Sequence, residues 1–142
     1  MDARSDIPAG FARHDRRSPL TEPWEPIYSR LDGDDVVLAL RAGDAHTNSR
    51  GFVHGGLISA LADNAMGLSC ARRIGAAGGL VTVNLAVDFL GAALKGQWLE
   101  FDTVFVKPGS TLCFAQAFVT ADGQPCARAN ATFRVLTRRA AA

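Results

Sequence analysis

The 142-residue sequence has few of the features that mark disulfide-rich, nucleic-acid-binding or membrane proteins. Its three cysteines, Cys70, Cys113 and Cys126, are odd in number and form no CxxC pair, which argues against a disulfide framework or a zinc site. A formal net charge of +1 gives no electrostatic reason to expect nucleic acid or an anionic membrane as the main partner. No segment approaches the length of a membrane-spanning apolar run, and the N-terminus has no apolar signal core. We therefore expect a soluble, cytoplasmic protein.

The chain divides by composition into an arm, one domain and a short tail. Residues 1–25 are polar, rich in proline and carry several arginines, and we interpret them as a loosely ordered N-terminal arm. Residues 26–138 are long enough to bury one hydrophobic core and are predicted to form a single domain. Residues 139–142 are an alanine-rich tail.

The hydrophobic pattern predicts an α+β domain. Residues 36–41 read as a strand, and residues 55–73 read as a helix that ends at a glycine-rich loop over residues 75–79. Four further strands are expected at 81–89, 98–106, 112–119 and 127–136, joined as an antiparallel meander that curls over the helix. In the first of these, Val81, Val83 and Leu85 lie on the predicted core face, which places Thr82 on the opposite face.

The predicted helix carries one carboxylate, Asp63, on an otherwise small-residue face. On a helical wheel, the bulky side chains gather on the side that should pack on the sheet: Leu57, Ile58, Leu61, Met66 and Leu68. The other side holds Gly56, Ser59, Ala60, Asp63, Gly67 and Cys70. A solvated surface face is the simplest reading, but such a face normally carries several Lys, Glu or Arg residues, and none lies between Gly55 and Ala71. An interface or a binding cleft fits this face better.

The order Asn48-x-x-Gly51-x-x-His54-Gly55-Gly56, with Asp63 nine residues after the histidine, resembles the hotdog-fold acyl-CoA thioesterases. Within them it is most similar to the PaaI-like branch related to phenylacetate-pathway thioesterases, and the resemblance covers residues 28 to 137. It implies a hotdog fold, in which a curved antiparallel β-sheet wraps one long central helix. It also implies a homodimer, often doubled into a homotetramer, with the active site between subunits. No cofactor is implied, because coenzyme A is part of the substrate. A metal is not expected either, because the spacing of His46, His54 and Asp63 matches no compact metal motif and thioester cleavage does not require one.

The resemblance also implies roles for individual residues. Asp63 would be the general base or the nucleophile, the backbone N–H of Gly55 an oxyanion donor, and Asn48 and His54 the groups that orient the thioester carbonyl or the attacking water. Thr82 matches a position where a hydroxyl assists the water in some relatives. These roles suit the chemistry, because thioester cleavage needs a nucleophile and a stabilised oxyanion, and helix N-terminal N–H groups supply the second.

Each of these residues also has a structural interpretation. Asn48 could be a left-handed turn residue, His54 could cap the helix, and Thr82 could reflect β-propensity alone. Further substrate contacts are expected from the following residues: Gly56, Arg50, Phe52, Met66, Phe89 and Lys107. Arg138 and Arg139 are additional candidates for the phosphates of coenzyme A.

The sequence thus predicts hydrolysis of a small, medium or aryl acyl-CoA to the free acid and coenzyme A. A hydratase of the same fold would place its catalytic histidine and acid at different spacings. A non-catalytic acyl-CoA-binding or sensor protein stays open as the alternative.

Overall fold

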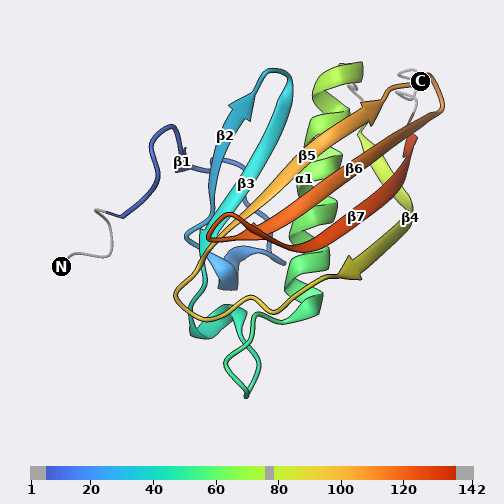
Figure 1. Ribbon diagram of the computed structural model, residues 1–142. Helices are drawn as coiled ribbons and strands as arrows, with labels where there is room; N and C mark the ends of the chain where they lie inside the picture. Colours follow the sequence, from blue (N-terminus) through green and yellow to red (C-terminus); the bar gives the residue numbers. More distant parts are fainter. Residues whose placement is uncertain (1–5, 76–78, 137–142) are drawn as a thin grey trace.

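A computed structural model describes residues 6–75 and 79–136. One long helix lies against one face of a seven-stranded antiparallel sheet (Figure 1). Within the described ranges, no helix is long and apolar enough to cross a membrane. The arrangement is the hotdog fold that the resemblance implied.

The helix α1 spans Gly55–Ile74, within one residue of the predicted range. Gly75 ends it with a φ of 60°, a left-handed conformation that glycine adopts without the steric cost of a Cβ. Residues 76–78 of the expected glycine-rich loop lie outside the described residues. The buried face includes Met66, as the wheel predicted, and differs from the wheel at two residues: Cys70 is fully buried, whereas Leu68 is only half-buried. Met66, an expected substrate contact, has its side chain in the core between helix and sheet.

The sheet has the order β1-β2-β3-β5-β6-β7-β4. Its strands have these bounds: β1 Ala12–Arg13, β2 Tyr28–Asp32, β3 Asp35–Arg41, β4 Leu80–Phe89, β5 Trp98–Lys107, β6 Leu112–Ala121 and β7 Gln124–Val135. The expected four-stranded meander needs correction, because only β5, β6 and β7 follow one another across the sheet. Residues 90–97 carry the chain past the start of α1, so that β5 pairs with β3 while β4 pairs with β7 at the far edge (Figure 1).

A β-bulge in β4 changes which side chains face the helix. Thr82 pairs with Phe133 of β7 and Asn84 pairs with Thr132, so Val83 is an extra residue with no partner of its own. Because Phe133 is buried under the helix, Thr82 lies on the helix side of the sheet. The predicted placement of Thr82 on the opposite face is therefore wrong, since the bulge reverses the alternation at this point.

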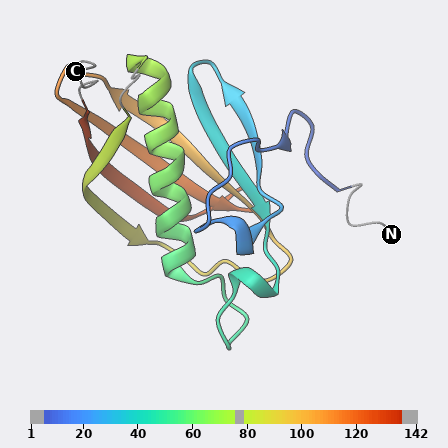
Figure 2. The same ribbon diagram turned by 180° about the vertical axis from the view of Figure 1, so that it is seen from behind.

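Residues 6–25 of the N-terminal arm contact the domain at several points. Its first part packs on the outer face of the sheet, where the Phe11 ring lies 5.4 Å from that of Trp98. It then pairs with β2 through β1 and forms the short 3-10 helix η2 over Glu22–Trp24. Figure 2 shows this blue segment passing the β2–β3 hairpin on its way to α1.

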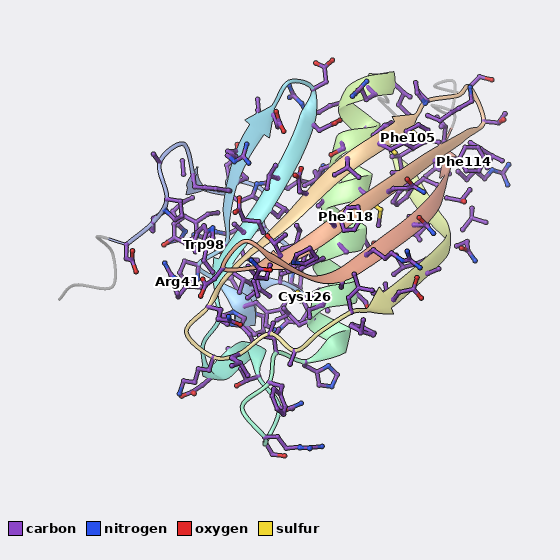
Figure 3. All side chains as sticks on the ribbon, in the orientation of Figure 1. Arg41, Trp98, Phe105, Phe114, Phe118 and Cys126 are labelled. Atoms are coloured by element: carbon purple, nitrogen blue, oxygen red, sulfur yellow. The ribbon has the colours of Figure 1, made fainter. Side chains whose placement is uncertain are left out.

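The outer face of the sheet, opposite α1, exposes several aromatic side chains. Phe105 comes from β5, and Phe114 and Phe118 come from β6 (Figure 3). The three cysteines are free and buried.

Candidate active site

Asp63 lies on the half-buried side of α1 that faces β4. The Thr82 hydroxyl donates a hydrogen bond to the Oδ1 atom of Asp63, with the two oxygens 2.7 Å apart. The bulge in β4 makes this contact possible, because it turns Thr82 toward the helix. The bond fixes the orientation of the carboxylate and leaves its second oxygen free to meet a water or a carbonyl carbon.

A cavity of about 520 Å³ opens beside this pair. Its apolar lining comes from the core side chains around the helix, which include Leu38, Leu61, Leu68, Leu80 and Phe133. Gly67 lies one turn after Asp63 and has no side chain to fill the cavity, as expected for the small-residue face. A polar wall comes from the N-terminal arm: His14, Arg16, Arg17, Ser18 and Thr21. Sequence analysis missed this wall, although the arginine cluster was its visible signal.

The start of α1 forms a second group of candidate residues. Nδ1 of His54 accepts a hydrogen bond from the backbone N–H of Gly56 at 2.8 Å, so His54 caps the helix, as its structural interpretation proposed. No hydrogen bond joins the Gly55 N–H to the described residues, which leaves this donor available at the positive end of the helix dipole. The ring of Phe89 packs on Gly55, and a Cβ added there would lie 3.0 Å from it. A smaller cavity of about 360 Å³, lined by His54 and Gly56, adjoins this end.

Asn48 shapes the loop before the helix. Its Oδ1 atom accepts hydrogen bonds from the backbone N–H groups of Arg50 at 2.9 Å and Phe52 at 3.2 Å. Its φ is not positive, so the turn depends on these side-chain bonds and not on a left-handed conformation. The Arg50 guanidinium lies 5.8 Å from the centre of the Phe52 ring. The three residues form one loop that projects beyond the helix start (Figure 1).

Within one chain, the two groups are separate. Asp63 follows Gly55 by eight residues on the same helix, which places them about 12 Å apart at about 1.5 Å of rise per residue. A thioester carbon cannot contact both groups at that separation. Lys107 lies away from the start of α1, because it is the last residue of β5, and β5 ends near the last turn of the helix (Figure 1). Arg138 and Arg139 lie outside the described residues.

The edge strand β4 lies next to the carboxylate. It pairs with β7 on one side only, so ten residues of strand present backbone groups that a second strand could pair with. Val81, Val83 and Phe89 of this strand are exposed apolar side chains. An exposed edge of this kind can pair with a strand of another chain.

The arrangement is that of a protein with a single helix-borne acid, an open helix N-terminus and an adjoining cavity on a hotdog fold. The chain belongs to the Thioesterase superfamily, whose sequence profile matches residues 50–127.

The relatives agree with this assignment. The chain is 37% identical over 131 residues to the Pseudomonas aeruginosa protein PA0474, which is named as a candidate esterase, and the match covers 92% of this chain and 98% of that one. It is 33% identical to human acyl-coenzyme A thioesterase 13 over 87 residues, 60% of each chain. The crystal structure of smu.793 from Streptococcus mutans bound to acetyl CoA superposes with a TM-score of 0.73 at 26% identity, covering 89% of this chain and 98% of that one.

Proposed function

We propose that this protein hydrolyses acyl-CoA thioesters at sites shared by two copies of the chain. The observation that carries the proposal is the 2.7 Å hydrogen bond from Thr82 to Asp63 at the mouth of a cavity. The names of two relatives support the substrate class, since one is an acyl-coenzyme A thioesterase and the other was crystallised with acetyl CoA.

Asp63 supplies the base or the nucleophile in this mechanism. Its free carboxylate oxygen either takes a proton from a water that attacks the thioester carbonyl, or attacks that carbon itself to form an acyl-aspartate anhydride, which water then hydrolyses to the free acid. The Thr82 hydroxyl holds the carboxylate in place. The thiolate of coenzyme A then leaves, and it needs little help from an acid because a thiolate is a weak base compared with an alkoxide.

The helix N-terminus of the second copy supplies the oxyanion site. The Gly55 N–H donates to the carbonyl oxygen as negative charge develops on it, and the helix dipole favours the same charge. His54 acts on this donor indirectly, by capping Gly56 and fixing the first turn. Arg50 and Phe52 on the projecting loop, and Phe89 against Gly55, are positioned to contact the substrate near this end.

The test is release of free thiol from a panel of short, medium and aryl acyl-CoAs. We expect wild type to be active on at least one, and Asp63→Ala and Asp63→Asn to be slower by about 10²- to 10⁴-fold, the usual contribution of a general base. Asp32→Asn is the matched control, because Asp32 is an exposed carboxylate at the end of β2, toward the opposite edge of the sheet from β4, and lines neither cavity. If wild type binds acyl-CoAs and cleaves none, the protein is a binding or sensor protein. If Asp63→Ala stays fully active, the site assignment is wrong.

A further inference from the structure

The N-terminal arm is fixed to the domain at several points. The Phe11 ring packs edge-on against Trp98 at 5.4 Å, and the His14 side chain shares a 3.0 Å hydrogen bond with Ser29 of β2. Thr21 is buried where the arm reaches the helix side of the sheet. Residues 14–21, between these anchors, therefore form a wall with a defined position and not a loose tail.

This wall faces the same cavity as the proposed catalytic pair. Arg16 and Arg17 line it together with Asp63 and Thr82, which lie on α1 and β4. The lining between them is mainly apolar, with Asn64 of α1 as a polar exception. A molecule that reacts at Asp63 and extends along the cavity would therefore meet the arm at the far side.

The arm gives the wall a positive charge. Burial lowers the pKa of His14 below its ordinary value, so this side chain is neutral near pH 7 and the charge comes from the arginines. Arg17 lies 3.7 Å from Glu22, but both side chains are more than half exposed, and such pairs are weak. Arg17 can therefore exchange this partner for an anion at little cost.

We propose that Arg16 and Arg17 bind an anionic group of the thioester substrate, which makes the arm part of the substrate-binding site. The planar guanidinium fork matches both carboxylate and phosphate oxygens. The anion therefore comes from one of two sources: the phosphates of coenzyme A or a carboxylate at the end of the acyl group. The inference rests on the proposed function for its reaction but not for the binding event itself.

Four substrates separate the two sources. Hexanoyl and adipyl groups, which differ by a terminal carboxylate, are each supplied as the coenzyme A thioester and as the N-acetylcysteamine thioester, which has no phosphate. We compare wild type with the double variant Arg16→Ala/Arg17→Ala, and with Arg16→Lys/Arg17→Lys, which keeps the charge. Arg134→Ala is the control, because Arg134 is an exposed arginine on the outer face of the sheet.

We expect the double alanine variant to raise KM by about 10-fold or more, with kcat nearly unchanged, only for substrates that carry the bound anion. A rise confined to both coenzyme A thioesters identifies the phosphates, and a rise confined to both adipyl thioesters identifies the carboxylate. The KM of the lysine variant should rise less than that of the alanine variant, because lysine keeps the positive charge. An unchanged KM for all four substrates overturns the proposal, and so does an equal rise in the Arg134→Ala control.

Calorimetric titration with coenzyme A and with adipate keeps the test separate from catalysis. If wild type hydrolyses none of the four substrates, the proposed function fails. The arm proposal still predicts that one of the two ligands binds wild type at least about 10-fold more tightly than the double alanine variant. Equal binding, or no binding of either ligand, overturns it.

Discussion

Replacing Thr82 with valine removes one hydroxyl group and keeps the β-branched shape of the side chain. That hydroxyl donates to the Asp63 carboxylate at 2.7 Å, and a hydrogen bond to a charged group is worth about 1.5–3 kcal/mol. If the bond holds the carboxylate in its reactive orientation, its loss lowers kcat about 10- to 100-fold, since each 1.4 kcal/mol or so is a factor of ten. In the free protein, water can replace the lost bond at this exposed position, so the free energy of unfolding should fall by no more than about 1 kcal/mol.

The assay is steady-state thiol release from the best acyl-CoA, with chemical denaturation of the same samples. Thr82→Ser keeps the hydroxyl and should stay within a few-fold of wild type. In an Asp63→Asn background, Thr82→Val should lower kcat hardly any further, because the two groups act as a unit. Wild-type kcat in Thr82→Val would refute the reasoning, and so would an undiminished loss in the Asp63→Asn background.

Three further predictions concern stability. His54→Ala should lower the free energy of unfolding by about 1 kcal/mol in urea titrations, because the Gly56 N–H loses its cap, whereas His54→Asn should keep most of it. Gly67→Ala should raise the melting temperature, because alanine is worth about 0.5–1 kcal/mol over glycine inside a helix, and its Cβ would make an ordinary 3.5 Å contact with Phe133; a lower melting temperature would contradict this packing. Burial lowers the pKa of His14 below 6.5 in the folded state, so the unfolded chain binds the proton first. Stability should therefore fall as pH drops from 6.5 to the folded pKa, and His14→Gln should flatten this slope.

Hydrophobic periodicity was sufficient to predict the positions of the helix and of most strands. The helix was placed within one residue of its observed end, because its caps and its apolar spacing are local signals. Strand β2 was missed, since its five residues include Arg30 and Asp32, which interrupt the apolar pattern. The predicted meander was wrong because the pairing of β4 and β5 depends on the path of residues 90–97. No local signal in that connection shows that it leads to the other side of the sheet.

The candidate site was predictable only in part. Spacing to His54-Gly55-Gly56 singled out Asp63, but the position of Thr82 depended on the bulge at Val83. An alternating pattern runs through residues 81–89 without a break, so the extra residue becomes visible only when β4 is paired with β7. The role of the arm could not be predicted for a similar reason: its arginine cluster signals charge, but not that residues 14–21 pack beside a helix that begins at Gly55.

The central claim is that one site needs Asp63 from one chain and the helix start from another. Asp63→Asn removes the proposed base, and Gly55→Pro removes the proposed oxyanion N–H at a first helical position where proline is favoured. Each variant is predicted to be nearly inactive alone, and the two should be mixed in equal amounts after dissociation and allowed to reassociate. In a symmetric dimer, half of the pairs are mixed and each mixed pair holds one intact site, so thiol release should recover to about a quarter of the wild-type rate per chain. If the mixture stays as inactive as its components although the chains have exchanged, each site lies within a single chain, and the account is contradicted.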